Sequence, residues 1–272
     1  MSHPTRQPAL AETMWRANAV YVKICYNGST AHLSINSRKT EGIFVKILEC
    51  KRIREPKNNR VYFLRIDPED VKVTLRKILE VLFDCSWINK FDKAYTRASF
   101  LKRVEPTLAD IEHKLLIANP DSISQDAGEY VVSELAREAI IQQLSYLDIP
   151  LAELYNKKRA GNPGFDFHSQ TIDEIIIFGE AKYLKDRNAF GNSLAQIVKF
   201  IDAGKDIKDI LDLEHFCSDS ALSAAHIGKK GFAAAFSTKS TASDDIIRHI
   251  QKNDHYKELI KYQELLLVAV NI

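Results

Sequence analysis

A run of four apolar residues, Ile175–Phe178, leads after one glycine into the charged pair Glu180 and Lys182. Such a run is typical of a buried strand, and charges at the end of a buried strand need a partner or a function. Asp166 follows a Pro-Gly turn fourteen residues before Glu180. If both segments are extended neighbours, two carboxylates and one ammonium group meet at one end of a sheet. Two carboxylates hold a hard divalent cation, and a lysine beside the metal helps to activate water for attack on a phosphodiester.

An acid followed two residues later by a lysine is common by chance, so only its context is informative. Glu180 with Lys182 is the copy that follows an apolar strand and has an acid on a preceding extended segment. The alternative, an ordinary surface ion pair worth under about 1 kcal/mol beside a turn aspartate at 166, stays open. The other five copies lie in helical or capping patterns, contain a proline or lack a nearby aspartate: Glu49-Cys50-Lys51, Glu55-Pro56-Lys57, Asp70-Val71-Lys72, Glu112-His113-Lys114 and Asp206-Ile207-Lys208.

The N-terminal third favours strands followed by helices. Residues 19–66 are rich in β-branched and aromatic residues separated by turns, which predicts a small, mostly antiparallel sheet. Pro68 with flanking acids then indicates a helix start, and helical periodicity continues to about Leu116. We expect residues 1–105 to form a strand-rich, then helical, region suited to docking a partner, and residues 106–272 to form a second domain.

The second region alternates helices and strands. The expected helices are 125–147, 188–201 and 243–262, the last with a break near Asn253. The expected strands are 164–167, 174–183, 231–238 and the C-terminal ELLLVAVNI. This order predicts a mixed α/β fold, with a central mixed sheet flanked by helices.

A further acid and several polar residues lie near the motif in the sequence. At about 100° per residue, Glu129 falls beside the apolar face of the helix 125–147, so it is the helix acid that looks toward the sheet. A first-turn glutamate favoured by the helix dipole is the simpler alternative. Candidate contacts to a nucleic acid are Lys158, Arg159, His168, Lys185 and Gln196, although solvated loops and helix faces look the same.

Composition sets few limits on function. The chain is 45% hydrophobic and 27% charged with a formal net charge of +2, which neither requires nor excludes a nucleic-acid partner. The start of the sequence lacks the apolar core of a signal peptide, and no stretch is long and apolar enough for a membrane span, so we expect a cytoplasmic protein. The four cysteines form no CxxC pair, which disfavours a zinc cluster.

The sequence from Pro163 to Asp166, followed by Glu180-Ala181-Lys182, resembles the PD-(D/E)XK nuclease superfamily. The likeness covers about residues 125–205 and implies a restriction-endonuclease-like core. It implies that Asp166 and Glu180 hold Mg²⁺ or Mn²⁺ with the Ala181 carbonyl as a further ligand. It also implies that Lys182 positions the attacking water and that Glu129 is an outlying acid. Gln196 with Phe200 is similar to a Gln-x-x-x-Tyr element of one branch, with Phe in place of Tyr.

A narrower likeness rests on Gly128-Glu129, the stretch GFDFH and the stretch FGEAKY. Together they resemble the nuclease subunit of Hachiman-type anti-phage defence systems, which works with a superfamily-2 helicase. This chain has no GxxxxGK phosphate loop, so a helicase would be a separate chain. Two other functions stay open: a stand-alone restriction endonuclease, and a catalytically silent nucleic-acid-binding or scaffold module with a nuclease fold.

Overall fold

The computed structural model describes residues 23–27, 30–34, 45–55, 59–117, 124–155, 164–239 and 241–272. The chain divides into two compact units, residues 1–40 and residues 41–272. In the first unit, strands β1 (Lys23–Asn27) and β2 (Thr30–Ser34) pair antiparallel. The second unit carries the described candidate site residues.

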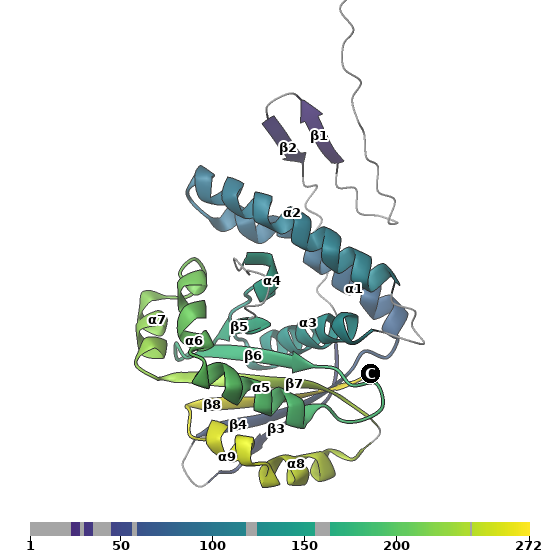
Figure 1. Ribbon diagram of the computed structural model, residues 1–272, viewed down its shortest axis with the longest axis vertical. Helices are drawn as coiled ribbons and strands as arrows, with labels where there is room; N and C mark the ends of the chain where they lie inside the picture. Colours follow the sequence, from purple (N-terminus) through teal and green to yellow (C-terminus); the bar gives the residue numbers. More distant parts are fainter. Residues whose placement is uncertain are drawn as a thin grey trace, which may run out of the picture. The chain divides into compact units, whose positions relative to one another are not determined.

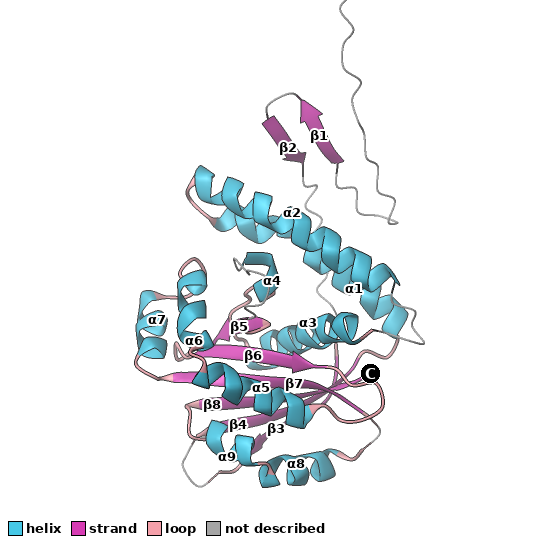
Figure 2. Ribbon diagram, viewed as in Figure 1, coloured by secondary structure: helices cyan, strands magenta, loops and turns pink. Residues whose placement is uncertain are grey.

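The second unit is built on a six-stranded mixed sheet in the order β3-β4-β8-β7-β6-β5 (Figure 1, Figure 2). Strands β4, β8, β7 and β6 run parallel, and the two edge strands β3 and β5 are antiparallel to their neighbours. The strands are β3 (Lys46–Ile53), β4 (Arg60–Asp67), β5 (Phe167–Gln170), β6 (Ile176–Lys182), β7 (Lys230–Thr238) and β8 (Glu264–Asn271).

Helices cover both faces of this sheet. Helix α3 contacts all five strands from β4 to β8, while α5 packs on β6 and β7 and against α9 (Figure 1). Helix α2 packs against α1, α3 and α4. No described helix is long and apolar enough to cross a membrane. The helices are α1 (Val71–Phe83), α2 (Ala94–Ile117), α3 (Gln125–Leu144), α4 (Ala152–Tyr155), α5 (Phe190–Asp202), α6 (Lys205–Asp209), α7 (Asp219–His226), α8 (Ser243–Lys252) and α9 (Asp254–Leu259), with 3₁₀ turns η1 (Cys85–Lys90) and η2 (Ile210–Leu213).

Local sequence explains several element boundaries. The Ser124 hydroxyl accepts a hydrogen bond from the Ala127 N–H and so caps α3, the helix that carries Glu129. Asn253 has an extended backbone that ends α8, and its side chain accepts from the His255 N–H to start α9. The inner strands β7 and β8 are buried along almost their whole length, as parallel strands covered on both faces must be.

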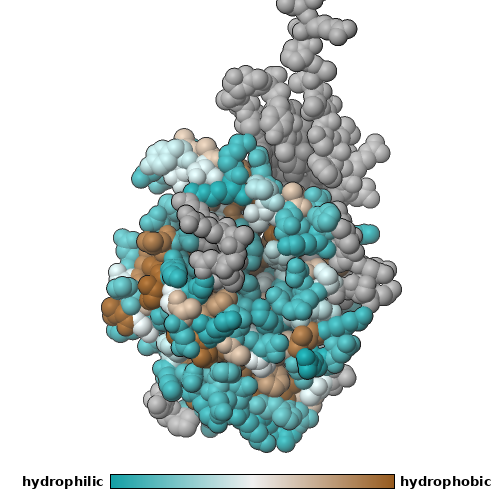
Figure 3. Space-filling view, in the orientation of Figure 1, coloured by the Kyte–Doolittle hydropathy of each residue, from teal (hydrophilic) through white to brown (hydrophobic). Residues whose placement is uncertain are grey.

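The outward faces of the covering helices are mostly polar. Helix α8 buries Ile246, Ile247 and Ile250 and exposes its charged residues. Figure 3 accordingly shows a largely hydrophilic surface over α8 and α9, and it shows hydrophobic surface over α6, η2 and α7. The exposed large apolar residues in or next to those last three elements are Ile207, Leu211 and Ile227.

The mixed α/β fold expected from the sequence is confirmed, as is the helix–strand order of the C-terminal half with its break at Asn253. The N-terminal strands are arranged differently from the expectation. Strands β3 and β4 do pair antiparallel, but β4 also pairs parallel with β8, so both belong to the central sheet rather than to a separate small one. Residues 41–272 form one unit, and the boundary expected at 105/106 lies inside α2.

Candidate functional site

Strand β6 brings Glu180 and Lys182 to one end of the sheet. Residues Ile176 to Ala181 are buried, and the strand period of two places Glu180 and Lys182 on the same face. Lys182 Nζ lies 2.8 Å from Glu180 Oε1. Glu180 is only 2% exposed, so this is a buried pair and not the solvated surface pair that the sequence left open. The Ser193 hydroxyl of α5 donates a hydrogen bond of 2.8 Å to the Glu180 carbonyl, which ties α5 to this strand.

Asp166 lies immediately before β5, one residue ahead of the strand. Its N–H donates to the Gly179 carbonyl (2.9 Å), and its carbonyl accepts from the Ala152 N–H (3.0 Å), so its backbone is held from two sides. Its carboxylate turns toward β6, where Oδ2 accepts a hydrogen bond of 2.8 Å from the Ala181 N–H. The acid on the preceding segment therefore meets the Glu180-Ala181-Lys182 stretch as the sequence predicted.

Glu129 reaches the same place from α3. Its Oε2 lies 3.3 Å from Lys182 Nζ, so the lysine contacts a carboxylate from the helix and one from the strand. Helix α3 comes this close to β6 because position 128 is a glycine. A Cβ at Gly128 would lie 2.3 Å from ring carbons of Tyr183, the residue that follows β6. The helix acid expected from angular position is thus confirmed to face the sheet.

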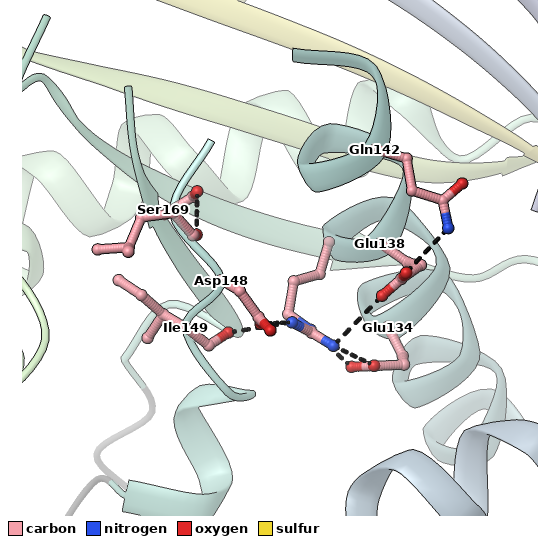
Figure 4. A network of polar contacts seen from close by, with 8 residues as sticks. Glu134, Glu138, Gln142, Asp148, Ile149 and Ser169 are labelled. Atoms are coloured by element: carbon pink, nitrogen blue, oxygen red, sulfur yellow. Dashed lines mark hydrogen bonds and ion pairs between the residues drawn. The ribbon is translucent and has the colours of Figure 1, made fainter. Parts of the chain in front are cut away.

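The segment just before α4 is held by an ion network that runs from the buried Arg137 and Glu134 to the exposed side chain of Asp148 (Figure 4). The Arg137 guanidinium donates two hydrogen bonds to Glu134, of 3.0 and 2.6 Å, and also bonds Asp148. Arg137 and Glu134 are almost fully buried, so neither side chain of α3 reaches bulk water. The network fixes the segment that covers the outer edge of β5, where the Leu147 N–H donates to the Gln170 carbonyl.

The surroundings of Glu180 oppose its negative charge. Burial raises the pKa of this carboxyl well above its usual range, the nearby Asp166 raises it further, and Lys182 only partly offsets both. One oxygen, Oε2, is buried and has no hydrogen-bond partner in the described part of the chain. Burial alone would lower the pKa of Lys182, but Glu180, Asp166 and Glu129 together outweigh it and raise that pKa. Three carboxyls beside one ammonium leave room for a further positive charge.

The donors at this point are of the kind that a divalent cation takes as ligands. Asp166 and Glu180 offer carboxylate oxygens, and Glu180 Oε2 still lacks a partner. In an extended strand the N–H and C=O of one residue point to the same side. Because the Ala181 N–H bonds Asp166, the Ala181 carbonyl lies on that side too. Within the described residues no group of three or more His, Cys, Asp or Glu side chains is arranged to hold a metal, so the candidate set is two carboxylates and a main-chain carbonyl.

The other residues expected to contact a nucleic acid are placed unevenly. Lys158 and Arg159 lie outside the described residues. Lys185 is exposed on the loop after β6, and Gln196 is partly exposed on α5. His168 is a correction: it is fully buried, because it sits on β5 under the helices, and its Nδ1 lies 2.6 Å from the Tyr155 hydroxyl. It is not positioned to contact a nucleic acid.

The sequence did not predict the packing role of several residues that build the site. Gly128 and Ser193 set how closely α3 and α5 approach β6, and Asp209 contacts the loop that carries Asp166. Gly128 was noted only as part of the narrower likeness, although a glycine inside a helical pattern often marks a close approach. Asp209 and Ser193 gave no signal, because a polar residue in a short helix or a first turn is ordinary.

No protein-family model, curated protein or solved structure matches this chain.

Proposed function

We propose that this chain is a metal-dependent nuclease that hydrolyses DNA phosphodiester bonds, as the likeness to PD-(D/E)XK nucleases implies. The observation that carries the proposal is the buried Glu180 carboxylate. It sits beside Asp166 and Lys182 with one oxygen unpartnered in the described structure. A buried carboxylate oxygen without a partner lowers the stability of the folded chain. Such a group therefore points to a functional site.

In this proposal Asp166, Glu180 and the Ala181 carbonyl hold Mg²⁺ or Mn²⁺. A bound ion of this kind lowers the pKa of a water ligand and stabilises negative charge on the phosphate. Lys182 donates hydrogen bonds to the attacking water or to a phosphate oxygen, and its contacts with Glu180 and Glu129 aim the ammonium at the site. The exposed Lys185, which follows directly on the loop, is a candidate phosphate contact.

The biological setting rests on the narrower resemblance alone. By that likeness the nuclease acts in the cytoplasm in anti-phage defence, with a helicase as a separate partner chain, and residues 1–105 are the candidate docking region. Part of that region, β3 and β4, belongs to the central sheet. A partner docked on β3 or β4 would therefore touch the same folded unit that carries the site.

The direct test is cleavage of plasmid, linear and single-stranded DNA with Mg²⁺. We expect Glu180→Ala and Lys182→Ala each to lower the rate at least about 100-fold, since each removes a group that stabilises charge in the transition state. Circular dichroism and thermal unfolding check that both variants fold. The matched controls are Glu49→Ala and Lys51→Ala, which break an ion pair of 2.7 Å in the same sequence pattern on β3. These should keep wild-type rates.

The same assay separates the remaining functions. Cutting at a defined sequence without a partner identifies a stand-alone restriction endonuclease, and cutting only after addition of a helicase identifies a partner-gated one. Full activity in both Glu180→Ala and Lys182→Ala removes the proposed site. No cleavage of any substrate, together with equal Mn²⁺ binding by wild type and Asp166→Ala in calorimetry, leaves the silent module.

A further inference from the structure

A buried acid from helix α6 contacts the loop that carries Asp166. Asp209, at the end of α6, is 6% exposed. Its Oδ2 accepts a hydrogen bond of 3.0 Å from the Phe165 N–H and lies 3.4 Å from His168 Nε2. Phe165 and His168 stand on either side of Asp166. One buried carboxylate therefore contacts the chain both before and after the candidate metal ligand.

The loop sequence is matched to this acid. A Cβ at Gly164 would lie 2.7 Å from Asp209 Oδ1 and 2.9 Å from Oδ2, so any other residue at 164 would push the carboxylate away. The requirement at Gly164 is for space beside the Asp209 carboxylate. The glycine that the sequence marks as part of a turn also makes room for Asp209.

His168 is held on its other side by a phenol. The Tyr155 hydroxyl lies 2.6 Å from His168 Nδ1, and both residues are almost completely buried. The Tyr155 ring in turn packs against Phe216, with ring centroids 4.9 Å apart. The His168 ring thus lies between the Tyr155 hydroxyl and the Asp209 carboxylate in the core. We call these three residues the Asp209 network.

We propose that Asp209 is a positioning residue for the metal site, with His168 and Tyr155 as its support. The Asp166 backbone is fixed by Ala152 and Gly179, and the chain after it is fixed by pairing of β5 with β6, so the segment before Asp166 is the one that needs a further support. Asp209 holds that preceding segment through its hydrogen bond from the Phe165 N–H, and its carboxylate also lies against the His168 ring without a hydrogen bond to it. This inference rests on the proposed function, because the position of Asp166 matters to the extent that Asp166 binds metal.

Outer partners of metal ligands are commonly worth about 10- to 100-fold in metal affinity. A purely structural role for Asp209 predicts a different outcome, namely lower stability with unchanged metal affinity. The chain offers a control for this distinction on the same helix. Asp206 is 2% exposed and forms a buried ion pair with Lys230 of β7, and the described structure shows no bond from it to the Asp166 loop.

The experiment compares wild type, Asp166→Ala, Asp209→Asn and Asp206→Asn. Calorimetric titration with Mn²⁺ gives the metal affinity, thermal unfolding in EDTA gives stability, and DNA cleavage against Mg²⁺ concentration gives the half-saturating metal concentration. We expect Asp209→Asn to weaken Mn²⁺ binding about 10-fold or more and to recover most of its maximal rate at high Mg²⁺. Asp206→Asn should bind Mn²⁺ within about twofold of wild type, whatever its loss of stability.

Tyr155→Phe is the second variant, because it removes one buried hydroxyl and keeps the ring. It should weaken Mn²⁺ binding in the same direction by a smaller factor, and it decides the question if Asp209→Asn does not fold. If Asp209→Asn folds and binds Mn²⁺ with wild-type affinity, the inference is overturned while the nuclease proposal stands. If Asp209→Asn does not fold, wild-type Mn²⁺ affinity in Tyr155→Phe overturns it in the same way. Equal weakening in Asp206→Asn also overturns it, because the effect is then one of general stability. Equal binding by wild type and Asp166→Ala overturns both proposals.

Discussion

At the scale of single residues, Glu180 is the side chain whose surroundings conflict most with its charge. It is buried, it faces Asp166, and burial is the main cause of its raised pKa. A carboxyl of this kind binds more protons in the folded chain than in the unfolded one at any pH between its two pKa values. Metal-free folded protein therefore loses stability as pH rises through that window, and gains it as pH falls toward the ordinary pKa of glutamate.

Replacing this group tests that conclusion. We expect Glu180→Gln to raise the melting temperature in EDTA near neutral pH, by about 2–4 °C for each kcal/mol gained in a chain of this size, because the amide carries no charge to desolvate. The gain should grow as pH increases from about 5 to 8, and cleavage should be lost. Thermal unfolding across that range, with Glu80→Gln on the exposed side of α1 as the control, measures the difference. A lower melting temperature for Glu180→Gln at every pH contradicts this account of the site.

At the scale of elements, the site depends on how closely α3 approaches β6. The separation is set by Gly128, which lies against the Tyr183 ring with no room for a methyl group. Lys182 is the neighbour of Tyr183 in the sequence, and Glu129 is the neighbour of Gly128. Lys182 Nζ lies 3.3 Å from Glu129 Oε2. A small displacement of the helix therefore acts directly on the contact that aims the lysine.

A pair of substitutions isolates this close approach. Gly128→Ala should destabilise the protein by about 1–3 kcal/mol, as overpacking does, and should lower cleavage. In a Tyr183→Ala background the same change should cost clearly less stability, since the ring carbons at 2.3 Å are gone and only the Cβ at 2.9 Å remains. Urea unfolding of the four proteins gives the coupling energy.

The control for these variants is Gly191→Ala in the first turn of α5, where an added Cβ meets just one atom, at 4.0 Å. That change should be neutral or slightly stabilising. Equal losses from Gly128→Ala with and without Tyr183 would show that the ring does not set the spacing.

At the scale of the whole unit, the sheet joins distant parts of the sequence. Strand β4 pairs with β8 some 200 residues later, from Arg60 with Glu264 to Ile66 with Val270. Val61, Phe63 and Leu64 are completely buried in this arrangement. Removing the first third of the chain would expose the edge of β8 and its apolar neighbours.

Two truncations test this organisation. A chain of residues 41–272 should fold and unfold cooperatively, with a melting temperature close to that of the full chain, because it keeps all six strands. A chain of residues 106–272 lacks β3 and β4 and should be unfolded or aggregated. Circular dichroism and size-exclusion chromatography measure both. A well-folded 106–272 fragment would restore the domain boundary expected from the sequence.

Prediction from sequence succeeded where the signal was local and periodic. The apolar run before Glu180 identified β6, and helical angle placed Glu129 on the face that meets it. It failed where contacts join distant segments. The pairing of β4 with β8 has no local mark, and Asp209 reaches Phe165 across 44 residues from a helix too short to show a period. The expectation for His168 was wrong because the sequence of a strand does not show whether a histidine ring is buried against a neighbour or exposed to solvent.

The hydrogen bond from the Ala181 N–H to Asp166 has a consequence for how substitutions at this position are read. The Ala181 N–H holds the candidate ligand Asp166, and the Ala181 carbonyl is itself a candidate ligand. The Ala181 methyl group is fully buried and fills space. Exchanging the side chain for another small one would leave those backbone atoms in place. A saturation library would therefore score position 181 by volume alone and rank it as ordinary packing, although its peptide unit belongs to the proposed metal site.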